Sequence, residues 1–158
     1  MATESHVSPV SPPPTAAQFL EIEVDTETGK ITTERMLMVV DCGRVINPMT
    51  AAGQVEGGMS QGLGFALTED MPYTTEGQPL ATNLKTYKIP HASEMPVMDV
   101  IFVETDEPSG PFGVKSVAEI AIDGVAPAMA AAIHNATGVW MRDLPYTKEK
   151  VKASLNNL

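Results

Sequence analysis

One stretch of the sequence combines the spacing of an amphipathic helix with an unusual number of glycines. Apolar residues recur at every fourth position of this stretch: Val55, Met59, Leu63 and Leu67. The same stretch contains five glycines: Gly53, Gly57, Gly58, Gly62 and Gly64. Each glycine disfavours a helix by up to about 1 kcal/mol relative to alanine, so a free-standing helix would gain nothing from them. We therefore predict a helix over about 50–67 that lies close to other backbone or to a large planar ligand.

The remaining patterns predict an α+β fold in which strands and helices are separate. Residues 19–24 alternate between apolar and polar positions, and turn-forming residues at 25–30 separate them from a second β-rich run, which predicts a hairpin. Asn47-Pro48 marks the start of the glycine-rich helix, because proline suits a first helical turn. The predicted elements are a strand at 19–24, a strand at 31–40, the glycine-rich helix, a strand at 96–104, an alanine-rich helix from 125 to about 136 and a short helix opened by 147–150. Regular βαβ alternation is absent, so we expect meander strands rather than a doubly wound sheet.

Two regions are predicted along the chain. Residues 1–16 are rich in serine and proline and contain too little apolar surface to offset the entropy of ordering, so we expect a disordered tail. Residues 17–158 form one domain. Several apolar runs of this domain lack an evident facing partner in the chain, which indicates that another polypeptide supplies part of the core.

Composition narrows the class of partners. The net charge of −10 would repel a phosphate backbone and an anionic membrane surface, so nucleic acid and membranes are not expected partners. Cys42 is the one cysteine, and the three histidines are isolated from it and from one another, so no metal site is predicted within the chain. We expect Cys42 to be a small buried structural thiol. No apolar run approaches the roughly 18 residues of a membrane span, and a cytoplasmic protein is expected.

Glu119 is the candidate catalytic residue. It follows a glycine-containing loop and precedes an apolar helix, where an acid often serves only to stabilise the start of the helix. The neighbouring apolar residues favour a different interpretation, in which the carboxylate is buried and acts as a base. The residues alone leave both interpretations open.

Several motifs resemble one known family in order and spacing. They are Asp41-Cys42-Gly43, Ile46-Asn47-Pro48, Gly53-Gln54-Val55-Glu56-Gly57-Gly58, Gln61-Gly62-Leu63-Gly64, Tyr87-Lys88-Ile89-Pro90, the stretch 113–119 (GVKSVAE), Ala126-Pro127-Ala128 and Leu144-Pro145. This series is similar to the last subdomain of the molybdopterin-binding subunit in molybdenum hydroxylases of the xanthine dehydrogenase and aldehyde oxidase type. The likeness covers about residues 17–155.

The resemblance implies roles for particular residues. In that family the acid that closes the lysine-containing loop lies beside molybdenum and takes a proton from the water-derived oxygen that attacks the substrate, and Glu119 holds this position. Gln54 matches a glutamine that hydrogen-bonds the pterin, next to Gly53. Val117 and Ala118 would form a close backbone wall near the metal. The commonest family loop has glycine at 116 and 118, whereas this chain has Ser116 and Ala118, which resembles a subgroup acting on purines and N-heterocycles.

The resemblance also implies cofactors and partners. The cofactor would be molybdopterin with molybdenum, expected in the cytosine dinucleotide form, and the substrate a purine, another N-heterocycle or an aldehyde. A larger molybdopterin-binding subunit, an iron–sulfur subunit and a flavin (FAD) subunit would complete the enzyme. Two other classes stay open: a non-catalytic assembly subunit or truncated gene remnant of this family, and a stand-alone domain that binds a small molecule.

Overall fold

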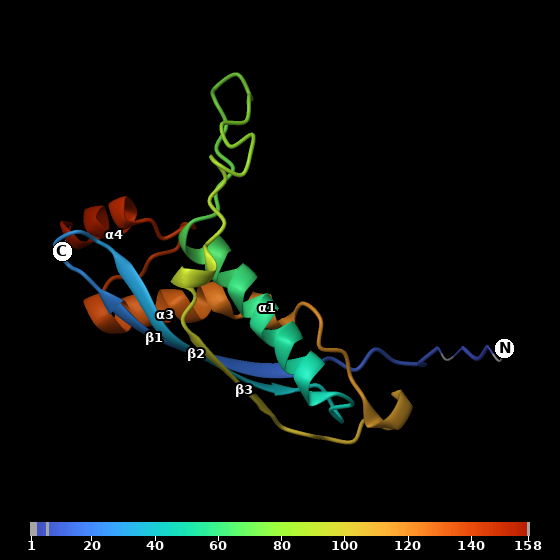
Figure 1. The fold of residues 1–158 in the computed structure, drawn as a ribbon. Coiled ribbons are helices and arrows are strands. Elements are labelled where there is room, and N and C mark those ends of the chain that lie inside the picture. The colour runs from blue at the N-terminus through green and yellow to red at the C-terminus, as the bar shows by residue number, and fades with distance from the viewer. Residues whose placement is uncertain (1–2, 6, 158) are drawn as a thin grey trace.

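The computed structural model describes residues 3–5 and 7–157, and these form a three-stranded sheet packed against helices (Figure 1). The strands are β1 (Thr15–Val24), β2 (Ile31–Asp41) and β3 (Val97–Phe102). The helices are α1 (Pro48–Leu67), α2 (Ile120–Asp123), α3 (Val125–Thr137) and α4 (Lys148–Leu155), with short 3₁₀ turns at Ala92–Glu94 and Pro111–Gly113. The predicted α+β class is confirmed, with every predicted strand and helix present. None of the described helices is at once long and apolar enough to span a membrane.

The sheet has the order β1-β2-β3 and is mixed. β1 and β2 form the predicted antiparallel hairpin, whose turn is held by the Asp25 carboxylate accepting from the backbone amides of Glu27 (2.8 Å) and Thr28 (3.1 Å). β3 pairs in parallel with β2, so the expectation of a meander was wrong. Parallel neighbours require a long crossover, and the chain between β2 and β3 includes α1.

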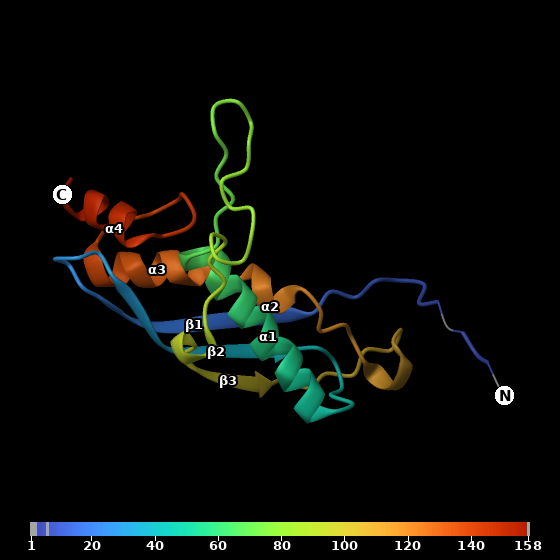
Figure 2. The same cartoon turned by 45° about the horizontal axis from the view of Figure 1, so that its top comes forward.

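One face of the sheet carries the core. Met36, Met38 and Val40 alternate along β2 and are almost fully buried, as expected for side chains that point to the same face of a strand. They belong to one cluster with buried residues of α1 and α3, and both helices lie on this side of the sheet (Figure 2). Methionine suits such an irregular interior because its unbranched side chain adapts to gaps.

Helix α1 begins as the sequence predicts. The Asn47 side chain caps the helix by accepting from the backbone amide of Thr50 (3.2 Å), and Pro48 occupies the first turn. Three of the five glycines have close neighbours: a Cβ at Gly58 would lie 2.5 Å from Cβ of Ala121, one at Gly62 would lie 2.7 Å from Cγ2 of Val125, and one at Gly64 would lie 3.2 Å from Cδ of Pro90. The predicted close approach is therefore confirmed where α1 crosses α2 and the start of α3.

Other parts of the described chain leave apolar side chains exposed. Phe19, Val97 and Ile101 on the sheet are between 50% and 63% exposed. The segment 70–91 leaves the body as a long irregular arm (Figure 1) and carries further exposed apolar residues: Met71, Tyr73, Leu80, Leu84 and Ile89. The described residues thus contain apolar runs without a facing partner, as predicted.

The N-terminal boundary differs slightly from expectation. β1 begins at Thr15, four residues before the predicted start, because the alternating pattern extends backwards through small residues. Residues 3–5 and 7–14 form neither helix nor strand. The predicted disordered tail of residues 1–16 was wrong for Thr15 and Ala16, which lie in β1. The disorder of the preceding residues stays a prediction, and residues 1, 2 and 6 lie outside the described part.

Candidate functional site

The loop that leads to Glu119 is held beside the turn that follows β2. The backbone amide of Arg44 donates to the carbonyl of Gly113 (2.9 Å), and the amide of Lys115 donates to the carbonyl of Cys42 (2.7 Å). Gly43 and Val114 form an isolated antiparallel bridge between the same two segments. Segments that are 70 residues apart in sequence thus run side by side at the end of the sheet.

A partly buried ion pair joins the same two segments. Nζ of Lys115 lies 2.9 Å from Oδ2 of Asp41, and the two side chains are only 13% and 17% exposed. The other carboxylate oxygen of Asp41 accepts from the Gly43 amide and from the Thr105 hydroxyl, both at 2.8 Å. The hydrogen bond from Lys115, followed by that from Gly43, lowers the pKa of Asp41 below its ordinary value.

Glu119 lies immediately before α2, as predicted, but its side chain is exposed. The expectation of a buried carboxylate was wrong for this chain. The reason is the packing of α2: Ala121 is fully buried against α1 at Gly58, whereas Ala118 and Glu119 precede the contact and stay at the surface. The one described contact of Glu119 is made by its backbone carbonyl, which accepts from the amide of Ile122 (2.9 Å).

Glu119 borders a surface hollow of about 340 Å³ between α1 and the loop. The residues lining it are Gln54, Gly57, Gly58, Gln61, Ala118, Glu119 and Ile122. Gln54 and Gln61 are seven residues apart on α1, so they lie on the same face of the helix. Nε2 of Gln54 lies 3.5 Å from the carbonyl oxygen of Ala118, at the limit of a hydrogen bond, and so links α1 to the loop.

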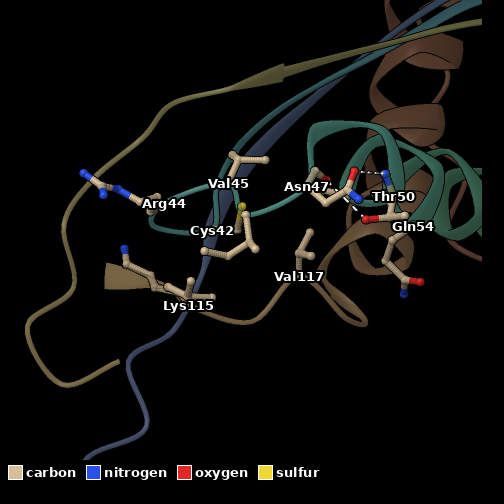
Figure 3. Close-up of a pocket in the computed structure, with 11 residues that line it drawn as sticks. Cys42, Arg44, Val45, Asn47, Thr50, Gln54, Lys115 and Val117 are labelled. Carbon is tan, nitrogen blue, oxygen red and sulfur yellow. Dashed lines mark hydrogen bonds between the residues drawn. The ribbon is translucent and has the colours of Figure 1, made fainter. Parts of the chain in front are cut away.

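A second hollow, of about 290 Å³, adjoins the first because Gln54 lines both. Figure 3 shows the residues that line this second hollow. Lys115 and Val117 of the loop lie on one side of it, and Asn47 and Thr50 at the start of α1 lie on the other. Cys42 also lines it. Its side chain is buried and burial raises the pKa of the thiol, as expected for an unreactive structural cysteine.

Over the described residues, no three histidine, cysteine or carboxylate side chains lie close enough together to hold a metal ion. The polar side chains that line the two hollows are the amides of Asn47, Gln54 and Gln61, the cationic groups of Arg44 and Lys115, the Thr50 hydroxyl and the single carboxylate of Glu119.

Comparison with known proteins identifies the family. A model of the molybdopterin cofactor-binding domain matches residues 2–96. The chain belongs to this family. The resemblance inferred from the motifs is thereby confirmed.

Relatives of this molybdopterin-binding chain include several molybdenum enzymes. The probable hypoxanthine oxidase XdhD of Escherichia coli is 36% identical over 159 residues, covering 100% of this chain and 17% of the relative. Quinoline 2-oxidoreductase from Pseudomonas putida 86 superposes with a TM-score of 0.81 at 33% identity, covering 85% of this chain and 18% of that one. Aldehyde oxidoreductase from Desulfovibrio gigas superposes with a TM-score of 0.83 at 33% identity, covering 90% of this chain and 15% of that one. The chain thus spans less than a fifth of the length of each.

The structure brings together most of the residues that the sequence singled out. Gln54, Ala118 and Glu119 line one hollow, and Val117 lines the adjoining one with Gln54. Gly53 lines neither of these two hollows, although it is exposed on α1 beside Gln54. Sequence reasoning assigned no role to Gln61, which its spacing of seven from Gln54 could have indicated, or to Asp41 and Lys115, whose pairing depends on the fold.

Proposed function

We propose that this chain is part of a molybdopterin-dependent hydroxylase in which Glu119 is the general base. The observation that carries the proposal is the arrangement of a single exposed carboxylate, Glu119, beside two amide side chains on a glycine-bearing helix face. The anchored loop 113–119 supports it, because a base must be held within hydrogen-bond reach of the proton that it accepts.

The residues at the hollow fit a pterin. A Cβ added at Gly53 or Gly57 would meet nothing within 4 Å, so this part of α1 presents open backbone rather than a packed interior. Packing within the chain therefore does not explain these two glycines, whereas close approach of a planar ligand would. Gln54 and Gln61 each offer both a donor and an acceptor to the edge of a heterocycle. We assign Gln54 to the pterin and Val117 and Ala118 to the wall beside it, with the cofactor in its cytosine dinucleotide form.

Glu119 would supply proton transfer. When bound, the molybdenum cofactor would supply the oxidation chemistry by taking up the hydrogen of the substrate carbon together with two electrons. The Glu119 carboxylate accepts the proton of the water-derived oxygen as that oxygen bonds to an electron-poor carbon. A carboxylate is a base of modest strength, which would suffice if the bound cofactor made the proton of that oxygen more acidic.

Partners are required by this proposal. The hollow at Glu119 is open, and catalysis needs a site that excludes bulk water. A larger molybdopterin-binding subunit would enclose it, and iron–sulfur and flavin subunits would carry the electrons away. The names of the relatives support a purine, another N-heterocycle or an aldehyde as the substrate class.

The test is Glu119→Gln in the enzyme assembled by co-expression with the partner subunits. Turnover should fall by roughly 10²- to 10⁴-fold, the usual contribution of a general base, while the molybdenum content per protein stays unchanged. Gln54→Ala is the comparison variant, because loss of a pterin contact should lower the molybdenum content instead. Turnover of Glu119→Gln near that of the wild type would refute the catalytic role and favour a non-catalytic assembly subunit.

A further inference from the structure

We propose that the Asp41–Lys115 ion pair is a latch that positions Glu119, which makes Asp41 and Lys115 positioning residues of the reaction. This inference rests on the function proposed for Glu119. It concerns the loop 113–119, whose last residue is Glu119 and whose third residue is Lys115.

The low exposure of the Asp41–Lys115 pair indicates that it maintains the local structure rather than only keeping the surface soluble. Most ion pairs at a protein surface are exposed and contribute little to stability, as expected of Arg35 and Asp99 here, which are 59% and 40% exposed. Asp41 and Lys115 are only 17% and 13% exposed at a separation of 2.9 Å. Losing one partner of such a pair leaves a charge that is poorly solvated, so the geometry is strongly maintained.

The carboxylate of Asp41 joins three segments at one point. Asp41 is the last residue of β2. Its carboxylate accepts hydrogen bonds from the Gly43 amide in the following turn and from the Thr105 hydroxyl in the segment after β3. Lys115 adds the fourth segment, the loop. The loop is thus fixed to the end of the sheet.

Between Lys115 and Glu119 the loop makes few polar contacts, and Val117 packs against the hydrophobic core. Residues 115–117 form no helix, strand or turn, and the described polar contact beyond Lys115 is the 3.5 Å approach of Gln54 to the Ala118 carbonyl. Lys115 is therefore the last strong polar anchor before Glu119. Freeing it would let the carboxylate leave the reach of about 3 Å that proton transfer requires.

The first experiment measures the latch directly in the full chain. Lys115→Met should speed hydrogen exchange of the Lys115 and Arg44 backbone amides by about tenfold or more, as expected on loss of a charge-assisted hydrogen bond. Asp41→Asn should do the same, and Lys115→Arg should restore protection. Arg35→Met is the matched control, because it breaks an exposed ion pair on the same strand. Unchanged exchange in both Lys115→Met and Asp41→Asn would overturn the latch.

The second experiment asks whether the latch acts through Glu119. In the assembled enzyme Lys115→Met should lower kcat by about tenfold or more with little change in KM, and should cause no further loss in a Glu119→Gln background. If the double variant instead lost kcat by the product of the two single losses, Lys115 would act independently of Glu119, and the positioning role would be overturned. Full turnover of Glu119→Gln alone would instead refute the proposed function, while hydrogen exchange would still decide whether the latch exists.

Discussion

The Asp41 side chain links distant parts of the sequence. Its ionisation is expected to make the stability of the chain depend on pH. Its pKa is lowered in the folded chain, first by Lys115, so its contribution to stability is fully present above the unfolded pKa of about 3.9 and is lost as the pH falls through the folded pKa. The free energy of unfolding should therefore decrease more steeply below about pH 4 in the wild type than in Asp41→Asn. Urea unfolding between pH 7 and pH 2.5 measures both slopes.

The difference between the two proteins isolates Asp41, because other carboxylates with lowered pKa values, such as Asp25 and Glu107, are present in both. At pH 7 Asp41→Asn should be less stable by about 1–3 kcal/mol, since a hydrogen-bonded charge has been removed. Parallel curves for the two proteins would show that Asp41 keeps an ordinary pKa in the fold.

The candidate site residues could be selected from the sequence, whereas their environment in the fold could not be predicted. The motif carrying Glu119 and the motif carrying Gln54 are continuous in sequence, so their residue types and spacing are visible without a structure. The exposure of Glu119 depends on which side of α2 packs against α1. The apolar neighbours of Glu119 in the sequence favoured a buried carboxylate, whereas the side that packs leaves it exposed. The pair of Asp41 with Lys115 spans 74 residues and depends on the parallel placement of β3.

At the scale of elements, some glycines of α1 are packed against another helix and others face open space. Substitutions at the neighbouring positions Gly58 and Gly57 compare the two kinds. Gly58→Ala should destabilise the chain by about 1–3 kcal/mol, because its Cβ would lie 2.5 Å from Cβ of Ala121 and force α1 and α2 apart. Gly57→Ala meets nothing within 4 Å and should stabilise the chain by up to about 1 kcal/mol through helix propensity. Thermal or urea unfolding compares them, and equal effects would disprove the division.

Helices were the easier elements to predict. The four-residue spacing of apolar positions and the Asn47-Pro48 start defined α1 to within a few residues. β3 was found as a strand, but its direction was not, because a strand pattern does not say which neighbour it pairs with. The direction follows from the crossover through α1, which is a property of the whole chain.

At the scale of the molecule, the second face of the sheet is uncovered. Side chains of β2 alternate, so Leu37 and Val39 point away from the core formed by Met36 and Met38. Three of their four partners across the sheet are apolar: Phe19 opposite Leu37, and Ala17 and Ile101 opposite Val39. The fourth, Asp99 opposite Leu37, is paired with Arg35. A parallel strand pair is normally buried on both faces, so this surface, which we term the open sheet face, suits contact with another polypeptide.

A charge on the open sheet face should therefore block assembly without unfolding the chain. Ile101 is 50% exposed on the edge strand β3 of this face, and Ile101→Asp would place a carboxylate in a contact that excludes water. Recovery of the larger molybdopterin-binding subunit with the tagged chain should fall at least about tenfold, since burying an unpaired charge costs more than the 1.4 kcal/mol that this factor represents. Thr26→Asp adds the same charge at the exposed β1–β2 turn and should leave recovery unchanged. Circular dichroism checks that both variants fold. If the folded Ile101→Asp chain recovered the partner as well as wild type does, the open sheet face would not be the contact surface, and the arm at 70–91 would be the next segment to substitute.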